Sequence, residues 1–323
     1  MTLAPLKMES PAASERIAWA AGSRERYPDG SLRGIVLTEE VRALLPCGEF
    51  VPAWTHASPR SKYAPSLSFY PSGAVKAARF EKPEELMAPN GDVVTAEKVS
   101  FFESGRIKRI FFTDGRLSAF WSERDEAGLL RETTLTLPWG RMTLLAGAAA
   151  YHENGLPRSV TLWPTERVNL RAGGRDYPVR QGFSLDSEGN LASLEPAFPV
   201  KVETPLGELE AYDPDALGVV ADVNSLKFDP RGSVVSLKTM AIIKRSGASP
   251  LVIRPFAGPH PLDDRKKVFH PLEVSFRQKI IRVVETGRGK TEGRVFSLDD
   301  SLEVVPFTGR ALVQISLPDA EGL

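Results

Sequence analysis

The chain of 323 residues contains one cysteine, four histidines and no excess of either charge, with 41 basic and 41 acidic residues. The single cysteine, Cys47, excludes an intramolecular disulfide and fits a reducing compartment. The balanced charge argues against the basic surface of a nucleic-acid-binding protein. No segment approaches the ~18 consecutive apolar residues of a membrane-spanning helix, and residues 1–20 lack the apolar stretch of a signal peptide. These absences predict a cytoplasmic protein with neither a membrane span nor a nucleic-acid partner.

Residues that form turns are abundant, with 26 glycines and 26 prolines. This composition favours many short strands over long helices. Six segments share a pattern in which an aromatic or apolar residue precedes a turn and its glycine. Their glycines are Gly30, Gly73, Gly105, Gly155, Gly189 and Gly232. We call these the main-turn glycines and the segments around them the main hairpins.

The pattern around these glycines is that of paired strands. In the third copy, Val99 and Phe101 stand two residues apart, so both side chains point to one face of a strand. Polar residues and a glycine then form the turn, because glycine readily adopts a positive φ. Beyond the turn, Ile107 and Ile110 stand three residues apart, which breaks the alternation of a regular strand. This interval predicts a β-bulge or a bend after each turn.

A second turn of the form Pro-x-Gly follows most main hairpins. The four examples are Pro46-Cys47-Gly48, Pro89-Asn90-Gly91, Pro138-Trp139-Gly140 and Pro205-Leu206-Gly207. Proline presets φ at the first central position of a turn. Gly48, Gly91 and Gly207 each follow a main-turn glycine by 18 residues. The constant offset predicts a unit of two hairpins that recurs along the chain, interrupted by insertions at 54–65, 113–131 and 212–224.

These features predict an all-β fold, a repeated β-hairpin meander or open solenoid-like sheet with a β-rich C-terminal cap. Units this small must stack on their neighbours to bury their apolar faces. We expect an N-terminal tail over residues 1–20, a repeat domain of about six units over 21–246 and the capping segment over 247–323. The sequence determines neither the oligomeric state nor whether the sheet is an open meander or a closed solenoid.

The pattern of an aromatic residue, a turn, a glycine and two aliphatic residues resembles the MORN-like repeats of bacterial proteins described as toxin–antitoxin-associated. The segments that carry the resemblance are Tyr70-Pro71-Ser72-Gly73, Phe102-Glu103-Ser104-Gly105, Tyr151-His152-Glu153-Asn154-Gly155 and Phe228-Asp229-Pro230-Arg231-Gly232. The match spans about residues 26–246 and lacks the closer-spaced glycines of the strict MORN pattern. It implies a sheet of repeated hairpins with a protein- or lipid-contacting role, and it transfers no functional residue.

Apparent nucleotide and metal motifs have simpler explanations. Gly289-Lys290-Thr291 ends like a phosphate loop, but Val284 occupies the position of that loop's first glycine, and a polar hairpin turn is favoured. His260, Asp263, Asp264 and His270 match no metal-ligand spacing. The segment from Asp186 to Asn190 lacks the ligand spacing of a calcium loop. We therefore predict no metal and no cofactor.

The sequence contains no recognisable catalytic motif. Cys47 lies inside a turn without a nearby base in sequence, and Asp299-Asp300 is only a nominal carboxylate pair. Tryptophans in turns and insertions are more suggestive, because aromatic residues at loop tips are enriched in binding sites. The candidate contact residues are Trp54, Trp121, Trp139 and Trp163. They also fit a structural role in cross-strand packing.

Two functions follow from these observations. The favoured one is a non-enzymatic protein-binding or scaffold module that presents an extended sheet surface and its insertions to a protein partner. The alternative is a carbohydrate-binding protein or a glycoside-active enzyme on a β scaffold, motivated by the tryptophans.

Overall fold

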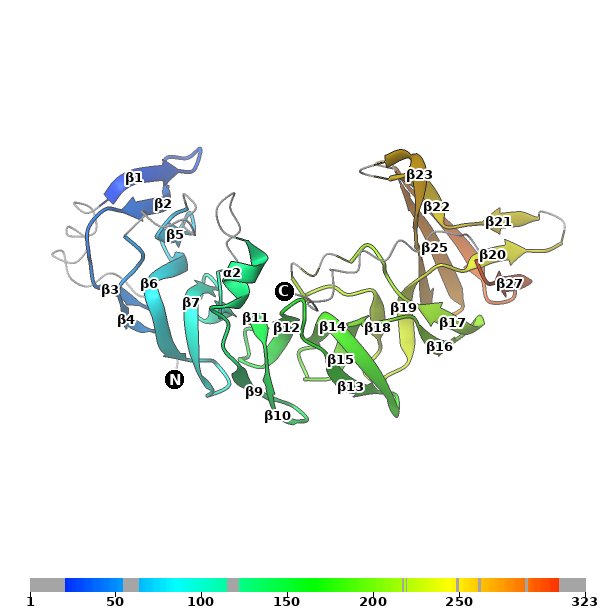
Figure 1. Ribbon diagram of the computed structural model, residues 1–323, viewed down its shortest axis with the longest axis horizontal. Coiled ribbons are helices and arrows are strands. Elements are labelled where there is room, and N and C mark those ends of the chain that lie inside the picture. Colours follow the sequence, from blue (N-terminus) through cyan, green and yellow to red (C-terminus); the bar gives the residue numbers. More distant parts are fainter. Residues whose placement is uncertain are drawn as a thin grey trace, which may run out of the picture. The chain divides into compact units, whose positions relative to one another are not determined.

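The computed structural model describes residues 21–54, 64–114, 122–216, 218, 220–247, 250–260, 263–287 and 290–307. Over these residues it is almost entirely β, with one principal antiparallel sheet of sixteen strands, several smaller sheets and one short helix (Figure 1). The predicted all-β hairpin meander is therefore confirmed. The predicted tail over 1–20 lies outside the described residues, and the boundary near residue 246 stays a prediction. Among the described residues, no helix combines the length and apolar character needed to cross a bilayer.

The chain divides into two compact units, of which the first comprises residues 1–166 and 185–190. Its part of the principal sheet follows the order β1-β2-β5-β6-β7-β8-β11-β12. These strands are β1 (Ala21–Arg26), β2 (Leu32–Leu37), β5 (Leu67–Phe69), β6 (Val75–Met87), β7 (Val93–Phe101), β8 (Ile107–Phe111), β11 (Ala146–Tyr151) and β12 (Pro157–Leu162). Two separate hairpins are β3 (Ala43–Leu45) with β4 (Gly48–Phe50), and β9 (Thr133–Leu137) with β10 (Gly140–Leu144). Helix α2 (Glu123–Ala127) begins at a capping box of Ser122 and Asp125.

The second unit comprises residues 167–184 and 191–323. Its part of the principal sheet follows the order β14-β15-β18-β19-β24-β25-β26, with β13 paired to β14. These strands are β13 (Val168–Ala172), β14 (Arg175–Leu185), β15 (Leu191–Pro196), β18 (Leu226–Phe228), β19 (Val234–Thr239), β24 (Leu272–Arg277), β25 (Ile280–Gly287) and β26 (Lys290–Ser297). The smaller sheets hold β16 (Val200–Thr204) with β17 (Gly207–Ala211), β20 (Ile242–Arg245) with β21 (Leu251–Ile253) and β27 (Leu302–Val305), and β22 (Phe256–His260) with β23 (Asp263–His270).

All six main turns have the same backbone geometry. In the second, Gly73 N–H donates to the carbonyl of Tyr70 at 2.9 Å, and Tyr70 N–H donates to the carbonyl of Ala74 at 2.8 Å. The main-turn glycines have φ values between 81° and 92°. This is a type I turn followed by a left-handed residue, which only glycine adopts without strain.

The bulge predicted after each turn is confirmed where the register can be followed. Phe101 pairs with Ile107 and Ser100 pairs with Arg109, so Lys108 has no opposite residue. The extra residue brings both Ile107 and Ile110 to the buried face. The residue five positions after the main-turn glycine is at most 2% exposed in all six hairpins: Ile35, Ala78, Ile110, Val160, Leu194 and Leu237. These side chains are part of the buried core.

The Pro-x-Gly turns also join strands, as predicted, in β3–β4, the outer parts of β6 and β7, β9–β10 and β16–β17. At the corresponding place in the chain, Gly173-Gly174 joins β13 and β14. We call these five the side hairpins. Four of their turns pack against main turns. A Cβ built on Gly105 would lie 3.7 Å from Pro46 Cβ, and one on Gly155 would lie 3.4 Å from the Pro89 carbonyl oxygen. Each of these prolines belongs to the side hairpin two main hairpins earlier.

Neighbouring main hairpins are linked by side chains in their turns. Tyr27 Oη donates to the carbonyl of Phe69, and Tyr70 Oη donates to the carbonyl of Phe101, each at 2.9 Å. His152 Nε2 lies 3.0 Å from the carbonyl oxygen of Leu185 and occupies the position equivalent to these tyrosines. His152 therefore has a role in stacking the hairpins.

Candidate functional site

The three candidate tryptophans that the structure describes lie in different environments. Trp139 is 44% exposed at the tip of β9–β10, where its Nε1 lies 3.3 Å from Met142 Sδ. Trp54 is half-buried and Trp163 is only 9% exposed, so Trp163 is a core residue. Trp121 lies outside the described residues. The structure therefore shows no shared surface formed by Trp54, Trp139 and Trp163.

The motifs set aside on sequence grounds have local structural roles where they are described. Burial raises the pKa of Cys47 to about 12, so its thiol stays protonated and unreactive at neutral pH. Asp186 Oδ1 accepts the N–H groups of Glu188 and Asn190 at 2.9 Å within its own turn. The side chains of His260, Asp263 and Asp264, and Gly289 of the GKT segment, lie outside the described part of the structure.

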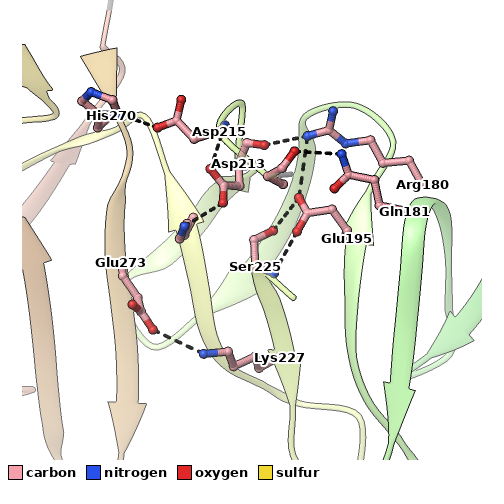
Figure 2. A network of polar contacts seen from close by, with 11 residues as sticks. Arg180, Gln181, Glu195, Asp213, Asp215, Ser225, Lys227, His270 and Glu273 are labelled. Atoms are coloured by element: carbon pink, nitrogen blue, oxygen red, sulfur yellow. Dashed lines mark hydrogen bonds and ion pairs between the residues drawn. The ribbon is translucent and has the colours of Figure 1, made fainter. Parts of the chain in front are cut away.

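A network of buried polar side chains lies on one face of the second unit (Figure 2). Strands β14, β15, β18 and β19 contribute Arg180, Glu195, Ser225 next to the start of β18, and Lys238. The segment 212–216 lies against this face and contributes Asp213. The network is the densest set of buried charges in the described part of the second unit, which makes it a candidate for acting on a ligand.

Glu195 is the most deeply buried group of the network, at 3% exposure. Its carboxylate accepts the N–H of Ser225 at 3.0 Å and the hydroxyl of Ser225 at 2.9 Å. Burial raises the pKa of Glu195 to about 7, and the nearby charge of Asp213 acts in the same direction, while the Ser225 hydrogen bonds and Arg180 oppose the shift. Glu195 thus titrates near neutral pH inside the protein.

Arg180 and Lys238 fasten the segment 212–216 to the sheet. Arg180 Nη2 donates to the carbonyl of Asp213 at 2.6 Å, and the guanidinium lies 4.8 Å from the ring centre of Tyr212. Lys238 Nζ forms a 2.7 Å ion pair with Asp213, whose side chain is only 6% exposed. Although burial opposes it, this hydrogen bond raises the pKa of Lys238. Gln181 adds a hydrogen bond of 2.8 Å to the carbonyl of Ala216.

At the edge of the network, His270 and Asp215 form a more accessible pair. His270 Nδ1 lies 2.6 Å from Asp215 Oδ2, with both side chains slightly more than one third exposed. The imidazole also stacks on Phe256 with ring centres 6.0 Å apart. No serine or cysteine is bonded to His270 in the contacts that the structure describes, so the pair lacks the nucleophile of a hydrolytic triad.

The geometry of this network indicates an anchor for the segment 212–216. Its charged groups bond one another and the backbone, and the most perturbed carboxyl, Glu195, is inaccessible to a substrate. The first unit contains a counterpart, in which Asp114 forms ion pairs with Arg79 at 3.0 Å and Lys98 at 3.6 Å. Sequence reasoning missed both anchors. A usable signal was that Arg79 and Lys238 occupy equivalent positions, six residues after a main-turn glycine, and that the insertions 113–131 and 212–224 each carry an aspartate at their second residue.

An open groove of about 880 Å³ lies in the first unit, between the outer part of β7 that begins at Val93 and strand β9. Its walls are formed by residues 90–95 on one side and 129–134 on the other. Val93 is 63% exposed and Leu129 is 47% exposed, so apolar side chains at both walls face solvent. None of the four candidate tryptophans lines the groove in the described part of the chain.

The closed end of the groove is held by side chains of the β6–β7 turn. Asp92 Oδ2 accepts the N–H of Thr136 at 2.6 Å and its Oδ1 accepts the Thr136 hydroxyl at 2.7 Å. Asn90 Nδ2 donates to the carbonyl of Thr136 at 3.0 Å. Although burial opposes it, the bonds from Thr136 and Asn90 lower the pKa of Asp92, so this carboxylate is ionised at neutral pH. Asp92 therefore connects the β6–β7 turn to strand β9, and we call this contact the Asp92–Thr136 tie.

Neither a protein-family model nor a curated protein matches this chain. The functional argument consequently rests on the geometry of the groove and of the two anchors.

Proposed function

We propose that the protein is a non-enzymatic binding or scaffold module, built on a repeated hairpin sheet, that holds a protein partner in the groove of its first unit. The observation that carries the proposal is the groove between two side hairpins, with exposed apolar side chains at both walls. Val93 and Leu129 provide contact area that a partner would bury, and clustered exposed apolar residues are typical of protein-binding surfaces. The resemblance to MORN-like repeats agrees with such a role.

The buried networks support a scaffold in which Asp114 and the segment 212–216 are held on the sheet. Asp114 and Asp213 pair with cationic side chains of strands, so these positions are fixed without a ligand. A preformed surface loses less conformational entropy on binding than a mobile one.

The carbohydrate alternative has less structural support. Sugar sites commonly combine carboxylates with an aromatic platform, and the groove contains Asp92, Glu97 and Glu132. Both carboxylate oxygens of Asp92 bond Thr136, and Glu97 Oε2 accepts the N–H of Asp114 at 2.9 Å. Phe112 is the aromatic residue among those that line the groove. We therefore favour a protein ligand.

The proposal is tested by site-specific photo-crosslinking in cells that produce the protein. A benzophenone amino acid is placed at Val93 on the groove, and in a matched control at Val295, which is 65% exposed on β26 of the second unit. We expect a discrete crosslinked protein adduct from position 93 and none from position 295. Absence of any adduct from position 93, together with binding of soluble glycans to the purified chain, would favour the carbohydrate alternative.

A further inference from the structure

Within the described ranges, the two walls of the groove are strand edges without a neighbouring strand. On β7, Val93–Ala96 pair with β6 on one side, and β8 pairs with β7 only from Lys98 onward. Strand β9 pairs with β10 on one side, and in the described residues no strand pairs with its other side. Open edges of this kind readily accept an added strand.

The hydrogen bonds of the closed end show which backbone groups face the groove. Thr136 N–H and C=O point toward β7, since Asp92 and Asn90 bond them. Alternate residues of an antiparallel pair direct these groups to the same side, so those of Thr134 also face the groove. On β7, Ala88 N–H donates to the Asp92 carbonyl, so the backbone groups of Asp92 face β6. The backbone groups of the next residue along β7 therefore face away from β6.

By that alternation Val93 and Thr95 direct their N–H and C=O groups into the groove from β7. In the described part of the chain, no hydrogen bond joins these backbone groups of Val93, Thr95 or Thr134 to another residue. Three backbone donors and three acceptors therefore face the same space. Their pattern is that of the two neighbours of a missing strand.

We propose that the groove binds an extended segment of a partner protein as an added β-strand. This inference rests on the proposed function and specifies the partner's conformation. Strand β7 runs away from the Asp92–Thr136 tie and β9 runs toward it, so a single added strand is antiparallel to one edge and parallel to the other. Main-chain hydrogen bonds would supply much of the affinity, as in other cases of strand addition.

The two faces of the added strand meet different surroundings. One face lies toward the interior beside Val94, which is 4% exposed, and the half-buried Phe112. The other face lies toward solvent beside Val93 and Leu129. We therefore expect an extended segment without proline, in which every second side chain is apolar, because successive residues of a strand point to opposite faces.

The probe for the test is a peptide selected from a displayed library of random 12-residue sequences, with the full chain as bait. Its affinity is measured by fluorescence anisotropy. The selected peptide is then synthesised with single N-methyl groups along its backbone, each of which removes one hydrogen-bond donor. Successive residues of a strand between two edges direct their N–H groups alternately to β7 and to β9, so we expect at least tenfold weaker binding at each of several consecutive central positions and little change at the peptide ends. A loss at alternate positions only would indicate pairing with a single edge, and a loss with a helical period or no loss at any position would overturn the inference.

Variants of the groove provide the second measurement. Proline at Thr95 or Thr134 removes one edge N–H, and valine at the same position is the matched control, because it removes the hydroxyl and keeps the N–H. We expect at least tenfold weaker peptide binding for T95P or T134P and near-native binding for T95V and T134V. E203P, at an exposed position of β16 in the second unit, controls for a general effect of proline. If the proline variants do not fold, the N-methyl profile on the native chain decides.

The outcomes separate this inference from the proposed function. A crosslinked partner at Val93 whose binding survives both T95P and T134P keeps the function and overturns the added strand. If position 93 gives no crosslinked adduct and the groove variants show no effect on peptide binding, both proposals are overturned. If light scattering shows a dimer of the chain that T95P dissociates, the occupant is a second copy, and the proposal of a partner segment is overturned.

Discussion

Gly189 packs directly against the ring of Pro138: a Cβ built on Gly189 would lie 2.9 Å from Pro138 Cγ. The glycine belongs to a main turn and the proline to the side turn two main hairpins earlier. The pairs Gly155 with Pro89 and Gly105 with Pro46 show the same relation. The glycine at this position thus serves both the positive φ of the turn and the close approach of a neighbouring turn.

This relation predicts different costs for alanine at two main turns. A Cβ built on Gly73 would have no atom within 4 Å, so Gly73→Ala should lose only the ~1–2 kcal/mol of left-handed strain. Gly189→Ala adds a collision with a rigid proline ring, for which we expect about 1–3 kcal/mol more. Urea denaturation of both variants measures the difference. Equal losses would show that the contact with Pro138 relaxes without cost.

The hairpins could be predicted from the sequence because their causes are local. The turn at Gly105, the bulge at Lys108 and the buried face of Ile110 all follow from residues within ten positions of one another. The packing of Gly189 on Pro138 could not be predicted, since it depends on how successive hairpins stack. Sequence periodicity describes one hairpin and contains little information about which turn of another hairpin it contacts.

The candidate sites were less accessible to sequence reasoning for the same reason. The tryptophans were chosen because aromatic residues bind ligands, yet Trp163 is buried in the core. The groove is made of backbone edges, and any sequence that forms strands provides such groups. Its location follows from the separation of β7 and β9, which no residue type signals.

Glu195 predicts a specific dependence of stability on pH. Its pKa is about 7 in the folded protein and near the ordinary 4.5 when unfolded. Between these values the folded state retains a proton that the unfolded state has lost, so this group's contribution is complete below pH 4.5 and disappears as the pH rises through 7. The full change is about 3 kcal/mol at most.

Glu195→Gln tests this dependence because glutamine has the same shape and does not titrate. Relative to the native protein, the variant should become more stable as the pH rises from 5 to 8, measured by urea denaturation at each pH. A constant difference between the two proteins across this range would contradict a raised pKa for Glu195.

The ion pair of Asp213 with Lys238 should contribute to the stability of the second unit. Lys238→Met leaves the buried carboxylate of Asp213 without its cation, and we expect a loss of about 2 kcal/mol. The loss should be smaller than for a fully buried pair, because the Lys238 side chain is 36% exposed. The double variant with Asp213→Asn should regain part of the loss.

A surface pair in the same unit is the control for this experiment. Lys201 and Glu208 are also 2.7 Å apart, but their side chains are 66% and 49% exposed. Lys201→Met should therefore change the free energy of unfolding much less than Lys238→Met does. If the two lysine variants lose equal stability, Asp213 does not act as an anchor.

The hydroxyl of Tyr70 should stabilise the stacking of the second and third main hairpins. Its hydrogen bond to the Phe101 carbonyl is 2.9 Å long, and Lys76 Nζ lies 5.5 Å from the centre of its ring. Tyr70→Phe removes the hydrogen bond and keeps the ring under the lysine. We expect a loss of about 1 kcal/mol, measured by urea denaturation.

The third main hairpin offers the reverse experiment. Phe102 occupies the position of Tyr70, with Lys108 Nζ 5.6 Å from its ring centre, but it has no hydroxyl to reach the next hairpin. Phe102→Tyr places a donor where Tyr27 and Tyr70 have theirs, facing the equivalent carbonyl of Tyr151. We expect a gain of about 0.5–1 kcal/mol. If Phe102→Tyr destabilises the protein while Tyr70→Phe is neutral, the stacking depends on the rings and their cations, and the hydroxyl groups add nothing to it.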